Sequence, residues 1–596
     1  MKQIEAIAVL SVDSDQVRFT VLSNRDGSEV ASSVETFPLM TAARNATTSV
    51  AAVEPDDRTE CSAVAAAAED EWPTVRGFVE QDPDRIWEAV LRVMTDAVDK
   101  MCRDGTPVTY VKSVAIVNEM GTLVAWNAVT GKPVHNAIHW SDVRMTAGGG
   151  GTGAAVQWLL QRSAAVRCSA DSCRFGTLDA WLTWKLTAGA TYQTDATNAS
   201  HTGLLDLSTL CWDRDAVRSC GLAGNAWPTV RRPHKRSTAV IVVGRLYGLS
   251  VHVTMARPGA VLYAQACYRR GQTAVTLTDL AAMAVCAHDR GPPRPQPSRV
   301  GPRRVVGYCE PNAADRKNPK IVYGLLAVSG ATSVAGWLRN MGVAKSWDEC
   351  AHAYEAAAPA LVGLHKSYMV PAFGGLPSAP YGRPDARPVV CGIGGHTGPA
   401  HLIAAAVDSM CHGVDDVVGC AAAGSASKLA EPLYVDGPCS ALDGLMRRLA
   451  DVTGHRLAVN RPDMAVTGAA RMAAAAMNVE YGDRHATVHY EPASAAEQRS
   501  AWRGQWAKAV RRSYGWAAVD GLGLDDRYAA QDSADRRRTG FSALADALRR
   551  FGLWYGDRVN EMLYAVRSYF APDVRPRRSV YVIDGSAATD GAACER

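Results

Sequence analysis

Carboxylate side chains are the groups in this chain that could accept a proton from an alcohol or hold a metal ion, and they are unevenly placed. Asp13 and Asp15 stand between two short apolar runs, and Glu119 follows another apolar run. A well-placed carboxylate base contributes about 10²–10⁴ in rate. By contrast, the long stretch from Ala216 to Thr278 contains no Asp or Glu at all. For Asp13 and Asp15 the flanking pattern favours an ordinary polar hairpin turn.

Histidine and cysteine side chains gather in one part of the C-terminal half. Their spacing matches no zinc signature, so scattered placement on helices and loops is the favoured interpretation, and no metal site is predicted. The fifteen cysteines are odd in number and include no CxxC pair. Without a secretory segment before them, they predict reduced thiols and a cytoplasmic location. The metal candidates are Cys391, His396, His401, Cys411 and His412.

Bulk composition is that of an ordinary globular protein. Of 596 residues, 47% are apolar and 21% are charged, and the net charge is +4. So small an excess over so long a chain creates no strong field, and no apolar run reaches the length of a membrane span. We therefore expect neither a nucleic-acid partner nor a membrane partner.

The elements that must position these side chains follow from periodicity. Strand-like and helix-like patterns alternate, which is compatible with an α/β fold. The spacing predicts a hairpin of strands 4–12 and 17–22, a helix over 82–100 and a strand over 111–117. Further helices are predicted at 154–161 and 178–186, and Ala-rich helices dominate 400–477.

Other segments interrupt this pattern. Residues 41–71 are rich in Ala, Thr and acids and are expected to form an insertion or a mobile loop. The Gly-rich residues 147–153 are expected to form a flexible connection. The basic, Pro-rich stretch 291–304 cannot be a helix or a central strand; it is either an exposed insertion or a proline-motif ligand. The tail after Trp516 carries an apolar face that would dock on the body or on another chain. That face comprises Phe541, Leu544, Leu548, Phe551, Val559, Leu563 and Val566.

Several longer blocks resemble the FGGY carbohydrate kinases, and among them the glycerol kinases, in the family order. The most specific is Thr-Asp-Ala-Thr-Asn-Ala-Ser at 194–200. Others are Thr-Gly-Lys-Pro-Val-His-Asn-Ala-Ile-His-Trp-Ser-Asp at 130–142, Phe-Gly-Thr-Leu-Asp-Ala-Trp-Leu-Thr-Trp at 175–184, and Pro-Ala-Phe-Gly-Gly at 371–375.

The resemblance implies a fold and a domain plan. It implies an α/β chain with two actin-like (ribonuclease H-like) domains, each a mixed five-stranded sheet flanked by helices, with ATP and Mg²⁺ in the cleft between them. The family reaction is ATP-dependent phosphorylation of glycerol. We expect an N-terminal kinase domain over 1–285, the Pro-rich insertion over 286–304, a C-terminal kinase domain over 305–516 and an extension over 517–596.

The family's catalytic base does not survive at its expected position. In the family an Asp lies ten residues before the Cys that matches Cys267, and counting back gives Arg257. Arginine stays protonated and cannot accept the proton. Arg257 is then either a solvated surface residue or a group that binds an anion where the family binds glycerol. No catalytic residue is predicted.

The phosphate-binding positions are also altered. Matching the first family loop at its final Arg places Ser11 where the family has its metal-associated Asp. The second loop, at 276–280, has lost both glycines and gained an acid, and Pro438 removes a backbone donor from the adenosine segment. Nucleotide binding is therefore doubtful. The remnants of the nucleotide site are Arg18, Thr276, Gly437 and Gly468, the last equally well explained as a helix-packing glycine.

The polyol pocket keeps one residue. The family's Arg-Glu pair becomes Met120-Gly121, whereas Trp140 matches the indole that packs on the glycerol carbons. A lone Trp is more often part of a core than a ligand contact. Glu119, next to the lost pair, is the candidate for a substitute acid.

Three functions follow from this pattern. The favoured one is a catalytically silent relative of glycerol kinase with a binding or regulatory role, self-associated or joined to an active kinase subunit. The alternatives are an active polyol kinase with relocated acids, and a scaffold that uses the Pro-rich insertion and the C-terminal extension.

Overall fold

The computed structural model describes most of the chain up to residue 516. The chain forms two units, 1–517 and 518–596, and every described residue belongs to the first. Residues 5–41, 78–146, 151–168, 172–222, 226–231, 239–278, 281–288, 302–309, 321–329, 334–345, 349–350, 352–355, 367–373, 375–376, 380–383, 385–425, 429–461, 463–482 and 486–516 are described.

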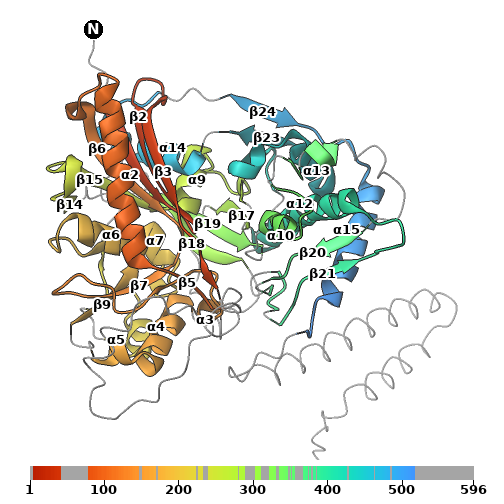
Figure 1. Cartoon of the computed structure of the whole chain (residues 1–596), viewed down its shortest axis with the longest axis horizontal. Coiled ribbons are helices and arrows are strands. Elements are labelled where there is room, and N and C mark those ends of the chain that lie inside the picture. The colour runs from red at the N-terminus through yellow and green to blue at the C-terminus, as the bar shows by residue number, and fades with distance from the viewer. Residues whose placement is uncertain are drawn as a thin grey trace, which may run out of the picture. The chain divides into compact units, whose positions relative to one another are not determined.

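The first large sheet is built on the predicted hairpin. Its strands are β1 (Ala6–Val12), β2 (Gln16–Ser23), β3 (Glu29–Thr36), β6 (Val111–Asn118), β14 (Ala239–Val240) and β15 (Ser250–Ala256). They lie in the order β14–β15–β6–β1–β2–β3. β1 and β2 pair antiparallel, whereas β1, β6 and β15 run parallel. The sheet is thus the expected mixed five-stranded one, with the short strand β14 added at its edge (Figure 1).

The second large sheet has seven strands, two more than expected. They are β16 (Thr273–Leu277), β17 (Ala282–His288), β18 (Arg303–Cys309), β19 (Ile321–Val328), β22 (Leu433–Asp436), β23 (Leu457–Asn460) and β24 (Thr487–Tyr490). Their order is β18–β19–β17–β16–β22–β23–β24. β16 and β17 belong to this sheet, so residue 285, the proposed domain boundary, lies inside it.

Helices fill three layers around these sheets (Figure 1). They include α2 (Pro83–Arg103), α6 (Leu178–Leu186), α9 (Arg257–Ala264), α12 (Pro399–Ser425), α13 (Asp443–Thr453) and α14 (Met464–Met477). Alternate residues of β1 face opposite sides, as a strand requires. Leu10 packs with α2 and α6, and Val9 packs with α9 and α14. The second sheet packs on α9 and α14 with one face and on α12 and α13 with the other, so α9 and α14 lie between the sheets.

Smaller elements complete the unit. A five-stranded sheet, two-stranded ribbons and short helices cover the remaining edges. The strands are β4 (Met40–Thr41), β5 (Val79–Gln81), β7 (Leu123–Asn127), β8 (Ala137–Ile138), β9 (Cys173–Thr177), β10 (Gln193–Asp195), β11 (Leu205–Asp206), β12 (Cys211–Trp212), β13 (Thr229–Arg231), β20 (Tyr368–Val370) and β21 (Val389–Cys391). The helices are α3 (Val143–Thr146), α4 (Gly151–Arg162), α5 (Ala164–Cys168), α7 (Ala196–Ser200), α8 (Arg214–Ser219), α10 (Val334–Asn340) and α15 (Ala496–Arg512), with 3₁₀ turns η2 (Val108–Tyr110), η4 (Gly244–Leu246) and η5 (Pro438–Ala441).

The predicted elements are confirmed, and one segment prediction needs correction. Gly151–Gly153 begin α4 instead of forming a flexible connection, because the glycines stand at the start of an apolar helix. Arg303 and Arg304, the last residues of the Pro-rich stretch, begin β18, which lies at the edge of its sheet, in keeping with the prediction that this stretch is not a central strand. The rest of that stretch, 291–301, lies outside the described residues, as do nearly all of the 41–71 insertion and the whole extension from residue 517. No described helix has the length and apolarity needed to cross a membrane.

Candidate functional site

Three charged residues stand directly after the ends of three neighbouring parallel strands. The last residues of β1, β6 and β15 are in register, Val12 with Asn118 and Asn118 with Ala256. The next residues along the chain are Asp13, Glu119 and Arg257. The carboxyl ends of parallel strands are where α/β folds bind ligands. The topology therefore brings these side chains to one edge.

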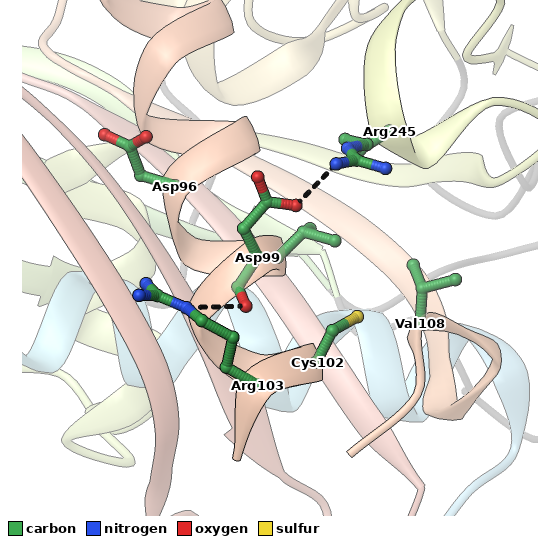
Figure 2. Close-up of a pocket in the computed structure, with 7 residues that line it drawn as sticks. Asp96, Asp99, Cys102, Arg103, Val108 and Arg245 are labelled. Atoms are coloured by element: carbon green, nitrogen blue, oxygen red, sulfur yellow. Dashed lines mark hydrogen bonds and ion pairs between the residues drawn. The ribbon is translucent and has the colours of Figure 1, made fainter. Parts of the chain in front are cut away.

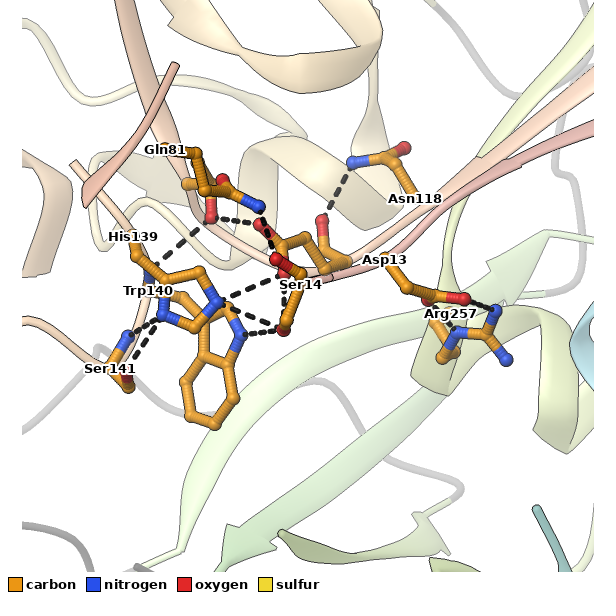
Figure 3. A network of polar contacts seen from close by, with 10 residues as sticks. Asp13, Ser14, Gln81, Asn118, His139, Trp140, Ser141 and Arg257 are labelled. Carbon is orange, nitrogen blue, oxygen red and sulfur yellow. Dashed lines mark hydrogen bonds and ion pairs between the residues drawn. The ribbon is translucent and has the colours of Figure 1, made fainter. Parts of the chain in front are cut away.

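Arg257 is buried and paired with carboxylates of its own chain. It begins α9 and is only 8% exposed. Its Nε and Nη2 each donate to an oxygen of Asp13 at 2.6 Å (Figure 3), and its Nη1 donates to Asp463 at 3.1 Å. Nη2 also donates to the Ser11 hydroxyl at 2.8 Å. Of the two alternatives for Arg257, the solvated surface residue is contradicted, because β15 is an interior strand and the residue after it enters the layer between the sheets.

The charges of this cluster shift each other's pKa. Burial works against the charged guanidinium, but the carboxylates of Asp13 and Asp463 outweigh it and raise the pKa of Arg257. Burial likewise opposes ionisation of Asp463, yet Arg257 holds the pKa of that carboxyl below its usual range. Asp463 also caps α14, accepting the N–H groups of Ala465 and Val466. Arg257 thus ties the β1–β2 turn to the first turn of α14.

A further carboxyl lies beside this cluster. Asp436 ends β22, opposite Thr276 of the parallel strand β16, and the Thr276 hydroxyl donates to its Oδ1 at 2.7 Å. Its Oδ2 has no hydrogen-bond partner among the described residues. Burial, reinforced by the charge of Asp463, raises the pKa of Asp436 to about 7 although Arg257 lowers it.

The glycines predicted at the nucleotide site make close backbone contacts. Gly437 has φ +96°, and a Cβ there would lie 2.3 Å from the carbonyl oxygen of Leu277. On α14, a Cβ at Gly468 would lie 2.1 Å from the carbonyl oxygen of Ala260 on α9. The helix-packing explanation of Gly468 is therefore supported, since only glycine allows α9 and α14 to approach so closely.

Ser14, the residue after Asp13, faces a second polar network (Figure 3). Its hydroxyl donates to Glu119 Oε2 at 2.6 Å and lies 2.9 Å from His139 Nε2. The indole N–H of Trp140 reaches the same oxygen at 3.4 Å. The Thr122 hydroxyl donates to the other oxygen of Glu119 at 2.6 Å. Glu119 and Trp140, separate candidates in the sequence, thus meet at one hydroxyl.

Glu119 is held as a carboxylate. Burial raises its pKa, but the charge of His139 and the hydrogen bonds from Ser14 and Thr122 outweigh burial and lower it. His139 Nε2 lies 3.1 Å from Glu119, and both side chains are buried. A buried carboxylate with hydroxyl donors is chemically able to accept a proton from an alcohol.

The remaining predicted residues take structural positions around the site. Arg18 lies on β2 opposite Ser11, close enough to Asp463 to help lower its pKa. Met120 packs in the core between the sheets, and Gly121, at φ +75°, lies against His201 and Trp140. Asp13 and Asp15 flank Ser14 in the hairpin turn, as predicted, but Asp13 also pairs with Arg257.

The suggested metal candidates do not converge. In the part of the chain that the structure describes, no group of three or more His, Cys, Asp or Glu side chains is placed to hold a metal ion. Cys391 ends β21 and His396 lies in an exposed loop. His401 lies in the first turn of α12, about three turns before the adjacent residues Cys411 and His412.

A groove of about 650 Å³ runs along the C-terminal half of α2 (Figure 2). α2 covers the face of the first sheet opposite to α9, so the groove is separate from the Arg257 cluster. An ion pair of 2.9 Å between Asp99 and Arg245 spans it. It is lined by Asp96, Val98, Asp99, Cys102, Arg103, Val108 and Arg245. The residues that line this groove do not place a proton acceptor beside backbone N–H groups that could bind a phosphate.

Two sheets with helices between them, and a site at the ends of parallel strands, define an actin-like kinase fold. Models of the FGGY family of carbohydrate kinases match the chain, the N-terminal domain at 46–149 and 145–255 and the C-terminal domain at 305–477. The chain belongs to this family.

Two similar curated proteins are glycerol kinases. The chain is 31% identical over 486 residues to glycerol kinase 2 of Streptomyces avermitilis, covering 75% of this chain and 91% of the relative. It is 32% identical over 477 residues to the glycerol kinase of Symbiobacterium thermophilum, covering 74% and 91%.

Solved structures agree on the fold. Plasmodium falciparum glycerol kinase with ADP matches with a TM-score of 0.63 at 19% identity, over 86% of this chain and 98% of that one. A ligand-bound xylulose kinase from Lactobacillus acidophilus gives 0.60 at 16% identity, over 85% and 98%. The two-domain actin-like fold is therefore shown.

Proposed function

We propose that this chain is a catalytically silent member of the FGGY family with a binding or regulatory role. The carrying observation is Arg257. It stands where the resemblance puts the catalytic base, it is buried, and its guanidinium is engaged by Asp13, Asp463 and Ser11. A guanidinium cannot accept the alcohol proton, and these bonds hold it in place.

The surroundings also disfavour ATP with Mg²⁺. Asp13 lies in the turn that the family uses for phosphate, and Asp436 and Asp463 lie nearby. Negative charge on these carboxyl groups repels the negative charge of a triphosphate. Arg257 is the cation that could offset this repulsion, but it is already paired with Asp13 and Asp463. The carboxylates do not converge on a metal position in the described residues. The residues present therefore do not fit the family cofactors.

A silent chain of this fold has a role if it joins other subunits. Many oligomers of this size are built from copies of one fold, and a chain that keeps the architecture while losing chemistry retains surfaces for such contacts. We infer self-association or association with an active glycerol kinase. Co-purification of the full chain with an active relative, read by light scattering, tests this; two separate species at micromolar concentrations would exclude the mixed assembly.

The activity test is a glycerol phosphorylation assay with ATP and Mg²⁺, run beside an active relative. We expect no turnover above background. Turnover within the usual enzyme range of about 1–10³ s⁻¹ overturns the proposal. A thermal titration with ATP, with and without Mg²⁺, is expected to leave Tm unchanged, because a ligand that binds the native state raises it.

One observation favours the alternative of an active polyol kinase. Ser14 donates its hydroxyl proton to the ionised, buried Glu119, which is the contact that an alcohol substrate makes with a general base. On this alternative Glu119 has taken over the lost role of the base. Any turnover found must then fall about 10²–10⁴-fold in Glu119→Gln.

A further inference from the structure

Two helices cross between the large sheets, and each leaves one sheet and packs on the other. α9 begins directly after β15 of the first sheet and packs on β18 of the second, so closely that a Cβ at Gly259 would lie 2.0 Å from the carbonyl oxygen of Gly307. α14 comes shortly after β23 of the second sheet and packs on β1, β6 and β15 of the first. A change in the angle between the sheets must therefore move these two helices against their partners.

Arg257 stands where both crossing helices begin. It is the first residue of α9, and its Nη1 donates to Asp463, which caps α14. Its other contacts reach the first sheet, because Nε and Nη2 donate to Asp13 in the β1–β2 turn (Figure 3) and Nη2 also donates to Ser11 of β1. One guanidinium thus joins the starts of α9 and α14 to one edge of the first sheet.

We propose that Arg257 is an interdomain clamp, which fixes the angle between the two large sheets by joining the first turns of α9 and α14 to the β1–β2 turn. The clamp is a conformational device built from the side chain that replaces the family's base. It goes beyond the proposed function, because it concerns how the two halves of the body move and not what they bind.

The geometry of the contacts makes the clamp sensitive to small movements. Helices that slide at an interface move by about 1–2 Å. The bond to Asp463 is 3.1 Å long and those to Asp13 are 2.6 Å long, and a hydrogen bond is lost by about 3.6 Å. Sliding of α14 by that amount breaks the bond to Asp463 and leaves the buried cluster with an unpaired charge. States with another sheet angle are therefore disfavoured.

The competing explanation is that apolar packing alone sets the angle. α9 and α14 approach closely at Gly468, and Arg257 would then only neutralise the carboxylates beside it. The two explanations differ in what happens when the bond to Asp463 is cut while the packing and the Arg257–Asp13 pair are kept. Only the clamp predicts a wider range of sheet angles.

Asp463→Ser makes that cut. Serine caps helices about as well as aspartate does, but its shorter, uncharged side chain does not reach Arg257. Spin labels are introduced as noncanonical amino acids at Lys100 and Arg447, which are exposed on α2 and α13, the outer helices of the first and second sheets. Double electron–electron resonance then measures the distance distribution between the labels in the full chain. We expect one narrow distribution in the wild type and a broadening by about 2 Å or more in Asp463→Ser.

The matched control is Asp82→Ser. Asp82 also caps a helix, α2, and has the same side-chain exposure as Asp463, 34%, but its arginine partner, Arg85, lies on the same helix. Asp82→Ser should give the distribution of the wild type. Equal broadening in both variants would trace the effect to capping and overturn the clamp.

A second variant changes the clamp itself. Arg257→Lys keeps the positive charge beside the carboxylates but lacks the planar fork whose separate nitrogen atoms face Asp13 and Asp463, so it should also broaden the distribution. Circular dichroism confirms that each protein is folded at the temperature of measurement. Unchanged distributions in Asp463→Ser and Arg257→Lys overturn the inference. The samples contain no nucleotide or glycerol, so turnover in the kinase assay would overturn the proposed function and leave this result standing.

Discussion

On one side of the β1–β2 turn, Asp13 faces a guanidinium that holds both of its oxygens; on the other, Ser14 faces a carboxylate, an imidazole and an indole. The first set consists of one guanidinium shared between the carboxyl groups of Asp13 and Asp463. The second is organised around a neutral hydroxyl that water or another alcohol can replace.

The difference matters because losing one partner destabilises a buried ion pair and a buried hydroxyl network by different amounts. A buried ion pair that loses one partner leaves an uncompensated charge, which is very costly. A hydroxyl network that loses one member loses hydrogen bonds that solvent or a ligand can restore. The Arg257 side should therefore act as a fixed structural feature and the Ser14 side as an exchangeable one.

Removing the cation should have the largest effect. Arg257→Met keeps the apolar stem but leaves Asp13 and Asp463 without their partner, and we expect the free energy of unfolding to fall by about 3–5 kcal/mol. Urea denaturation followed by circular dichroism measures it. The matched control is Arg92→Met, since Arg92 forms a similar two-bond pair with Glu35 on an exposed surface and should change stability little. Equal losses in both variants would mean that Arg257 is no special anchor.

Neutralising Glu119 should lower the free energy of unfolding by less than Arg257→Met does. Glu119→Gln keeps the shape of the side chain but removes the charge that His139, Ser14 and Thr122 stabilise, so we expect a loss of about 2 kcal/mol at pH 7. The folded pKa of Glu119 lies below its usual 4.5, so its contribution is present above that value and disappears as the pH falls through the folded pKa. Denaturation at several pH values should show the two proteins converging as the pH falls below 4.5 and through the folded pKa of Glu119. A difference independent of pH would argue against a stabilised carboxylate.

The elements were predictable from sequence because their signals are local. The hairpin, α2, β6 and α6 each show their period within a few residues. The predicted turn at Asp13 was right for the same reason. Its role was not predictable, because Arg257 lies 244 residues away and Asp463 a further 206 residues beyond Arg257.

The missing information was the register of three parallel strands. A charged residue after each of Val12, Asn118 and Ala256 is visible in the sequence, but nothing local shows that those strand ends align. The same holds for His139, which sequence reasoning missed although it lies one residue from Trp140. Given the strand order, charged residues directly after parallel strands would have been a usable signal.

Asp436, beside the Arg257 cluster, gives a prediction about how stability depends on pH. Its folded pKa is raised to about 7 from 3.8, so the folded state binds a proton more tightly than the unfolded chain. The stability that it contributes is therefore full below about pH 4 and is lost as the pH rises to 7. Asp436→Asn keeps an acceptor for Thr276 and removes this dependence. Wild-type stability relative to the variant should fall by about 1.4 kcal/mol per pH unit in that window and level off above it. A flat difference between pH 4 and 7 would mean that Asp436 titrates normally.

Of the variants considered, Trp140→Phe should change the free energy of unfolding least. The size of that change decides whether Trp140 packs only at the margin of the core or belongs to the core itself. Its side chain is half-buried and packs at the margin of the core between the sheets, and its one polar contact, to Ser14, is long at 3.4 Å. If Trp140 packs only at this margin, Trp140→Phe keeps an aromatic ring and loses one weak hydrogen bond, at a cost of about 0.5–1 kcal/mol in urea denaturation. A core indole such as Trp181, which is fully buried, should lose clearly more in the matched Trp181→Phe variant, since a cavity is left behind. Equal losses would make Trp140 a core residue, and the Ser14 side of the turn would then be as fixed as the Arg257 side.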